Sequence, residues 1–400
     1  MELFKALFVL TFCLFLMAQP AKAQKKPLRV VPINVWSGLE YKDLFYFGGY
    51  ESTEEREVES DTVTPLGKST IEPLPILMYD TDVGFGYGAK IFILNKLQRN
   101  ESLDLILFNS TKGERLYRTV FSMPDFESRQ GKVYPLAVDF VVDYDKWIKN
   151  SFFGIGNNSS FSDREFYTKE PFEISLTLSR GFSPHIVGQV GARYKTVRNS
   201  NFSEDSRLVN LPPNLNASRT SLSSFLVNFR YDTRNSFINP SQGLVLQGET
   251  EFVPRSTLSN VEFARLAGWV QHYFLLFYPK TVLALRLGVQ DLIGKELPIQ
   301  VLLPIGGSST LRGSPQDRYL DKTAAVFNAE LRFPIFWRFG GVAALDAGKV
   351  WSSPAKVDLK RWAMNPTAGL RFYMETFVVR MDVGFGKDTT GLYFNFGQIF

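Results

Sequence analysis

The sequence contains one cysteine and two histidines among its 400 residues. Cys13 lies in an N-terminal apolar run, so the rest of the chain cannot form a disulfide, a thiolate nucleophile or a cysteine-ligated metal site. The two histidines, His185 and His272, have no serine or acidic residue at a spacing that suggests a catalytic dyad or triad. We therefore predict that the protein is not an enzyme and uses no metal ion or cofactor.

The sequence also lacks long apolar runs and a strong charge imbalance. After the N-terminal run no segment has 18 consecutive apolar residues, which excludes ordinary membrane-spanning helices. Its 45 basic and 40 acidic residues are interspersed, so no basic stripe indicates binding to nucleic acid. The acidic segment 51–60 is expected to be solvated. The chain is rich in aromatic residues (14%), has no disulfide and has no membrane-spanning helix. We therefore expect a large soluble β protein or a β-barrel of an outer membrane.

The first 23 residues have the pattern of a secretory signal peptide. Glu2 and Lys5 precede the run "LFVLTFCLFLMA", and the small residues of 21–23 follow it. The alternative, a membrane anchor, needs a longer run. Phe12 is too large for the position before a lipoprotein cysteine, so we expect no lipid anchor. We therefore predict export through a cleaved signal peptide.

Apolar and polar residues alternate with a period of two in many segments of the chain. The clearest examples are 136–143, 225–231, 327–333 and 379–385. This period predicts β-strands, and the large apolar side chains with charged residues between them fit a membrane barrel with a polar lumen. Periodicity alone would also fit a soluble sandwich.

Fifteen such strands can be placed, and a bacterial single-chain barrel normally has an even number. We predict an all-β, antiparallel transmembrane barrel of 16 strands, with the remaining strand within 147–167 or in "LPILMYD" just before Val83. The fifteen predicted strands lie near 83–95, 101–110, 114–124, 132–144, 171–181, 185–197, 219–231, 242–254, 260–275, 280–292, 322–334, 339–349, 362–373, 376–387 and 391–400.

The last ten residues favour the membrane barrel over the sandwich. Counting back in twos from Phe400 gives Gln398, Phe396, Phe394 and Leu392. An alternating aromatic strand that closes on phenylalanine is what outer-membrane barrels carry as an assembly signal, and only Gln398 departs from the apolar choice. The pattern therefore predicts location in the outer membrane, in contact with its lipids.

One long segment between strands, "LPIGGSSTLRGSPQDRYLD" at 303–321, carries a single arginine between Leu311 and Gly313. With both termini on the periplasmic side, this segment is an outer loop. The alternation along the two strands turns Glu330 and Asp346 toward the lumen on neighbouring strands. Two carboxylates this close need a cation between them. We expect the loop to fold into the barrel and Arg312 to bind both acids; the alternative is an exposed arginine in a flexible loop.

The stretches "GGSSTLRGS", "FNAELRFPI" and "ALDAG" resemble the C-terminal barrel of the Omp85 superfamily, the BamA/TamA-type bacterial surface antigen (D15) domain. The resemblance implies that Leu311, Arg312 and Gly313 form the motif at the tip of the sixth outer loop. It also implies that Glu330 and Asp346 are the acidic partners of the arginine. Ser314 stands where the family has an aromatic residue.

Two further stretches extend the resemblance over roughly residues 72–400. "FFGIGN" at 152–157 is similar to a segment ahead of the family's middle strands. "DTRNSFINPSQG" at 232–243 is similar to its periplasmic turn. The matching positions of that turn are Asp232, Arg234, Asn239, Pro240 and Gly243.

Residues 24–71 lie between the predicted signal peptide and the predicted barrel, 72–400. This segment is too short and too polar to form one of the POTRA domains that precede the barrel in many family members. We therefore expect a POTRA-less branch in which 24–71 is an N-terminal periplasmic extension or linker. The resemblance then implies separate periplasmic or lipoprotein partners and client outer-membrane proteins.

The family resemblance implies that the barrel assists insertion or translocation of proteins, or other substrates, through a weak seam between the first and last strands. Gly84, Gly86 and Gly88 in the predicted first strand leave little to pack, and Phe396 and Phe400 lie in the last. The glycines have an alternative role, which is to make room for the inserted loop. The alternative function is a passive pore or a structural barrel.

Overall fold

The computed structural model describes residues 67–400 except 81–83, 213–214, 216–217, 277–279 and 375–377. The predicted signal peptide and residues 24–66 of the predicted extension lie outside these residues. The only helices in the described ranges are two 3₁₀ turns, η2 (Phe161–Asp163) and η3 (Pro354–Lys356). None of the described helices is long and apolar enough to cross a membrane.

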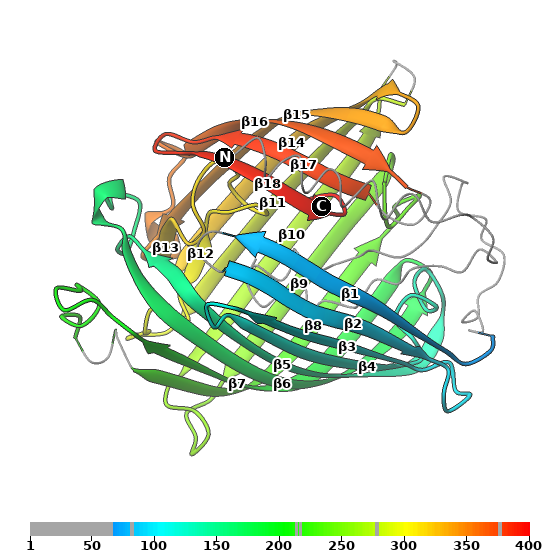
Figure 1. Ribbon diagram of the computed structural model, residues 1–400, viewed down its shortest axis with the longest axis horizontal. Coiled ribbons are helices and arrows are strands. Elements are labelled where there is room, and N and C mark those ends of the chain that lie inside the picture. The colour runs from blue at the N-terminus through cyan, green and yellow to red at the C-terminus, as the bar shows by residue number, and fades with distance from the viewer. Residues whose placement is uncertain (1–66, 81–83, 213–214, 216–217, 277–279, 375–377) are drawn as a thin grey trace.

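Sixteen strands form one antiparallel sheet that curves round to a barrel, as Figure 1 shows. Each strand pairs with the strands that precede and follow it, except that β14 follows β11 because β12 and β13 form a small separate sheet. The first nine strands are β1 (Thr70–Asp80), β2 (Gly84–Leu94), β3 (Ser102–Ser110), β4 (Arg115–Met123), β5 (Tyr134–Phe152), β6 (Glu165–Ser183), β7 (Ile186–Ser200), β8 (Arg219–Asp232) and β9 (Gly243–Val253). The others are β10 (Phe263–Leu275), β11 (Val282–Ile293), β12 (Leu303–Ile305), β13 (Tyr319–Asp321), β14 (Thr323–Phe336), β15 (Phe339–Trp351), β16 (Ala363–Tyr373), β17 (Val378–Phe385) and β18 (Thr390–Phe396).

The predicted number of 16 strands is confirmed, and the missing strand is β1, which contains "LPILMYD". The region 147–167 holds no strand of its own. It contains the extended ends of β5 and β6, each of which is 19 residues long, and the connection 153–164 between them. A Trp147–Asn150 bulge lies in that extension.

The two faces of the sheet differ in polarity as expected for a membrane barrel. On β8 the outward side chains of Phe225, Val227 and Phe229 are 49–62% exposed. The inward side chains of Glu330 on β14 and Asp346 on β15 are 0% exposed. This pattern excludes a soluble sandwich, because a sandwich buries its apolar face and leaves its charged face in water.

The two ends of the barrel are also unequal. One end carries the short connections such as 184–185, 337–338 and both described termini; we call it the short-turn side. The other end carries the long connections 201–218 and 294–322, and we call it the long-loop side. Long loops outside and short turns in the periplasm are the expected arrangement of such barrels.

Candidate functional site

The connection 294–322 between β11 and β14, called here the inserted loop, folds into the barrel. Its two short strands, β12 and β13, pair antiparallel, and Figure 1 shows them inside the curve of the large sheet. Apolar side chains of the loop pack against Phe152, Phe263 and Val350 of the wall. Fully burying a side chain of this size contributes about 1.5–3 kcal/mol. The buried apolar residues of the loop in this cluster are Leu297, Ile299, Leu302, Leu303, Ile305, Leu311, Tyr319 and Leu320.

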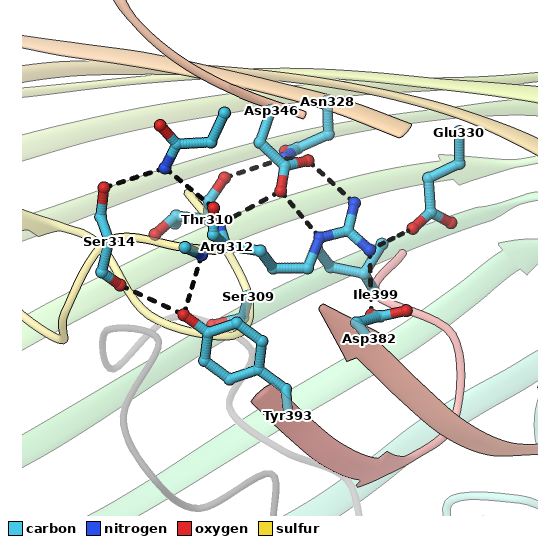
Figure 2. A network of polar contacts seen from close by, with 12 residues as sticks. Ser309, Thr310, Arg312, Ser314, Asn328, Glu330, Asp346, Asp382, Tyr393 and Ile399 are labelled. Carbon is cyan, nitrogen blue, oxygen red and sulfur yellow. Dashed lines mark hydrogen bonds and ion pairs between the residues drawn. The ribbon is translucent and has the colours of Figure 1, made fainter. Parts of the chain in front are cut away.

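Arg312 at the tip of the loop binds three carboxylates that come from three strands (Figure 2). Its Nε and Nη2 donate to the two carboxylate oxygens of Asp346 on β15, at 2.7 and 2.9 Å. Its Nη1 donates to Glu330 on β14 at 2.7 Å and to Asp382 on β17 at 2.9 Å. A guanidinium suits this site because its fork binds one carboxylate with two parallel bonds and leaves a donor for others.

The backbone of the loop tip is bound to the same wall. The Arg312 amide donates to Asp346 at 3.1 Å, and Asn328 donates both to Asp346 and to the Thr310 carbonyl at 2.8 Å. Asn328 pairs with Asp346 across β14 and β15, which is the register expected from a turn centred near Trp337. Burial would lower the pKa of Arg312, but Glu330, Asp346 and Asp382 together raise it well above its usual value.

Gly313 allows the loop tip to touch the wall directly. Its φ is +91°, a conformation that side chains rarely adopt. A Cβ atom there would lie 2.5 Å from the Gly386 nitrogen and 2.7 Å from the Gly384 carbonyl carbon. A Cβ at Gly384 would in turn lie 2.4 Å from the Gly313 nitrogen. The two backbones meet without side chains between them, which fixes the depth at which Arg312 enters.

Ser314 stands at the position where the resembled family has an aromatic residue. Its side chain is buried and makes polar contacts. Its hydroxyl accepts a bond of 2.9 Å from the Asn365 amide, which also donates to the Arg312 carbonyl. The aromatic ring at this place comes instead from Tyr393 on β18, whose hydroxyl accepts from the Gly313 amide at 2.9 Å (Figure 2). The last strand therefore contacts the loop tip.

Three further arginines of the wall surround the three acids. Arg332 donates to Glu330 at 2.9 Å, and Arg371 donates to Asp382 at 2.6 Å. Arg380 lies 3.5 Å from Asp382. These wall residues are at most 3% exposed. The loop lock, defined as Arg312 with Glu330, Asp346 and Asp382, therefore sits in a wider network of alternating charge.

The prediction that the last strand runs to Phe400 is wrong, because β18 ends at Phe396. Gly397 has a φ of +82°, and the next three residues turn into the lumen. Arg371 donates to the Gln398 side chain at 3.0 Å, and Arg332 donates to the Phe400 carbonyl at 3.0 Å. The Phe400 ring packs near Tyr273, 6.3 Å between centroids. Phe400 therefore cannot be part of a seam facing lipid.

The predicted seam glycines also lie elsewhere. Gly84, Gly86 and Gly88 are on β2, which pairs with β1 on one side, and Gly86 and Gly88 also pair with β3 on the other. A Cβ at Gly88 would lie 2.1 Å from the Leu107 carbonyl oxygen of β3, so this glycine permits close approach between neighbouring strands. The first strand is β1. Within the described residues β1 pairs only with β2, and β18 pairs only with β17.

A second arginine of the inserted loop joins three connections on the long-loop side. Arg318 is buried and donates to Asp388 in the β17–β18 connection at 3.0 Å. It also donates to the Ser159 hydroxyl in the β5–β6 connection at 2.8 Å. The Gly156 amide donates to the Leu320 carbonyl at 2.8 Å. The "FFGIGN" segment is thus a contact surface for the loop.

The predicted periplasmic turn is on the short-turn side and is closed by its own charges. Arg234 donates to the two oxygens of Asp232 at 2.7 and 3.1 Å. Gly243 has a φ of +113°, and a Cβ there would lie 2.4 Å from the Thr233 carbonyl oxygen. Asn239 accepts a bond of 3.0 Å from Gln398, which ties this turn to the end of the chain, while Pro240 is buried.

The two histidines make ordinary structural contacts. His185 bonds to the Asp232 carbonyl at 3.0 Å through Nδ1, and its ring meets that of Tyr231 edge-on. His272 is exposed on the outer face of β10, 3.9 Å between ring centroids from Phe274. That the protein is not an enzyme stays a prediction.

The fold and the loop lock agree with the comparisons. The Omp85 superfamily domain matches residues 95–400, more than half of the chain. This chain belongs to the Omp85 superfamily. No curated protein matches it in sequence. Omp85 barrels are proteins of the bacterial outer membrane, and the usual orientation of such barrels predicts that the long-loop side of this one is the outer side.

Solved Omp85 structures share the fold at low identity. BamA from Haemophilus ducreyi lacking POTRA domains 1–3 has a TM-score of 0.58 and 14% identity, over 82% of this chain and 70% of that one. CdiB from Escherichia coli has a TM-score of 0.56 and 13% identity, over 82% of this chain and 61% of that one. The chain thus spans less than two thirds of CdiB. The POTRA-less assignment and the domain boundaries stay predictions.

Sequence reasoning found Arg312, Glu330 and Asp346, and the structure brings them together. It missed Asp382 and Tyr393. The alternation in 379–385 already turns Asp382 to the polar face, so this pattern was enough to predict Asp382 as a third acidic partner of Arg312. Tyr393 is on the same inward face one strand later, opposite Asp382.

Proposed function

We propose that this barrel assists the insertion or translocation of proteins at the outer membrane, through the edge between β1 and β18. Family membership supports the proposal, and one observation on β1 carries it. Pro73 and Pro75 lie in the middle of that strand, and proline has no backbone N–H to donate. Within a sheet, proline is confined to edge strands, strand starts and bulges.

The two prolines weaken one edge of β1 selectively. Residues two apart in a strand direct their N–H groups to the same side, so both missing donors belong to one edge. All eleven residues of β1 are in register with β2. We infer that the missing donors belong to the other edge, the one that would face β18. A short last strand of seven residues has few bonds to offer in return.

An edge with unpaired backbone groups can pair with an incoming strand. The hairpin β17–β18 is held from inside by the tip of the inserted loop: Asp382 pairs with Arg312, and Tyr393 accepts from the Gly313 amide. In this proposal the client strand pairs at the weak edge while the inserted loop fixes the hairpin on the other side. Separate periplasmic or lipoprotein partners would deliver the clients, and outer-membrane lipids would receive them.

The decisive experiment restores the missing donors. Cells that depend on a plasmid copy receive the double variant Pro73→Val and Pro75→Val, and the outer-membrane proteome is measured after the native copy is depleted. We expect the variant barrel to fold and to complement poorly, because β1 can then pair along its free edge. The matched control is Pro366→Val, which changes a proline of the interior strand β16 that is in register with Leu345 of β15 and lies one residue outside the pairing of β16 with β17.

Depletion alone separates the functions. Broad loss of barrel proteins supports assembly, and loss of one or two exported proteins supports a dedicated translocation role. An unchanged outer-membrane proteome contradicts the proposal and leaves the passive pore as the function. Full complementation by the double proline variant would reject the edge as the working part.

A further inference from the structure

A row of basic side chains crosses the lipid-facing surface at the outer ends of β4 to β8. Arg115 pairs with Lys146 across β4 and β5, and Arg198 pairs with Arg219 across β7 and β8. Between them on β6 is Glu170, in register with Arg198. These five residues, called here the basic row, carry four positive charges and one negative charge.

Aromatic residues lie directly below the basic row on the same face. Tyr117 of β4 is in register with Tyr144 of β5, and their rings stack with centroids 5.9 Å apart. Tyr144 is in register with Phe172 of β6. Aromatic girdles mark the membrane–water interfaces of such barrels. The basic row is two residues farther out along the strands, about 7 Å above the aromatic residues.

The side chains of the row are open to the outside, in contrast with the buried charges of the lumen. Arg115 and Arg219 are exposed, and the side chain of Arg198 is 67% exposed. Glu170 is the acid within the row, 3.2 Å from Lys146 and 3.9 Å from Arg198. One carboxylate cannot neutralise four cations, so the row keeps a surplus of three positive charges at the height of lipid head groups.

We propose that the basic row binds the phosphate group of an anionic lipid in the outer leaflet. Arginine forks bind phosphate oxygens through paired hydrogen bonds, and basic residues next to a membrane attract anionic lipids. The acyl chains of such a lipid would lie against the apolar wall below, where Phe225 and Val227 of β8 are exposed. The ligand class follows from position and charge and does not depend on the proposed function.

The test uses the full chain purified in a non-ionic detergent and native mass spectrometry with added lipid. Phosphatidic acid and phosphatidylcholine with the same acyl chains are titrated separately, and inorganic phosphate is added as a competitor. We expect phosphatidic acid to bind more tightly than phosphatidylcholine. The triple variant Arg115→Gln, Arg198→Gln and Arg219→Gln should weaken binding of phosphatidic acid roughly tenfold or more, because each arginine contributes to the attraction of the anionic lipid.

Two further variants make the result specific. Glu170→Gln removes the acid of the row and should tighten binding of phosphatidic acid. The control triple variant Arg255→Gln, Lys360→Gln and Lys387→Gln removes three exposed charges from other connections of the long-loop side and should leave binding unchanged. Heat-modified gel mobility reports that each variant is folded.

Equal binding by the wild type and the basic-row variant would overturn the proposal. Equal losses in the two triple variants would also overturn it, because they would show a general charge effect. Competition by inorganic phosphate at the same concentration as phosphatidic acid would assign the row to a free anion and reject the lipid.

Discussion

Two of the buried charge networks in the described part of the lumen are assembled in different ways. The loop lock joins Arg312, a residue of a connection, to acids of three strands. The second network, called here the strand network, lies on β6, β7, β9 and β10. There the contacts are between Arg193 and Glu173 or Glu251, between Lys195 and Glu173, and between Arg265 and Glu249 or Glu251.

This difference shows which charged side chains are positioned by the sheet and which depend on their own ion pairs. The strand network is made only of strand residues. Some are in direct register on neighbouring strands, as Glu173 and Lys195 are, and Arg193 reaches Glu251 across β8. No strand register positions Arg312, whose place depends on its own ion pairs and on the backbone contact at Gly313. Losing a charge should therefore destabilise the barrel in both networks, but should release the inserted loop in only one.

The largest effect is expected from Arg312→Ala. Removing one partner of a buried ion pair costs about 3–5 kcal/mol, because the other charge stays buried without compensation. Asp346 then keeps Asn328 as its hydrogen-bond donor. We expect a lower free energy of unfolding in a urea titration and rapid cleavage of 303–321 by proteinase K. A loop that stays resistant would show that its apolar residues alone hold it.

Arg193→Ala in the strand network is the matched comparison. It leaves Glu251 with Arg265, 3.4 Å away, so we expect a loss of about 2–3 kcal/mol in the free energy of unfolding. Proteinase K should cut the inserted loop no faster than in the wild type. Release of the loop here would mean that the two networks are coupled, and the comparison would fail.

Gly313→Ala tests the backbone contact of the lock without changing a charge. The added methyl group overlaps the backbone of β17 and requires a left-handed conformation, which together cost about 1–3 kcal/mol. We expect partial protease sensitivity and weaker protection of the backbone amide at position 313 in hydrogen exchange. Gly397→Ala, also at positive φ but with no atom within 4 Å of its Cβ, controls for backbone strain alone.

Ser314→Ala should have the smallest effect, about 1 kcal/mol, because one buried hydrogen bond from Asn365 is lost. The unfolding midpoint in urea should shift slightly, and the loop should remain protected. A large effect would indicate that Ser314 takes the full role of the aromatic residue found in other family members.

The fold was accessible from the sequence because period-two alternation is strong wherever one side of a strand meets lipid. β1 was the uncertain strand because Pro73 and Pro75 oppose strand formation locally, and only pairing with β2 overrides them. Glu330 and Asp346 were accessible because they lie on adjacent strands. Asp382 is three strands from Glu330 in the sheet, and Arg312 and Arg371, which each bind both acids, bring it into the same site.

The turn at Gly397 could not be read from the alternation. Phe394, Phe396, Gln398 and Phe400 continue the period of two, so the pattern predicted one straight strand. A single positive φ and the arginines of the lumen redirect the last residues inward. The alternation of apolar and polar residues predicts the face that each side chain prefers. It does not predict a backbone turn that takes the chain out of the sheet and into the lumen.

The long β5–β6 hairpin has a mechanical consequence. Nineteen residues at about 3.3 Å each exceed the membrane thickness, so the hairpin forms a projection beyond the membrane. Ser159 of its connection meets Arg318 of the inserted loop, and Arg318 meets Asp388. This projection is thereby linked through Arg318 to the β17–β18 hairpin, which borders the proposed exit for clients. A force applied to that projection from outside the cell would be felt at β17 and β18.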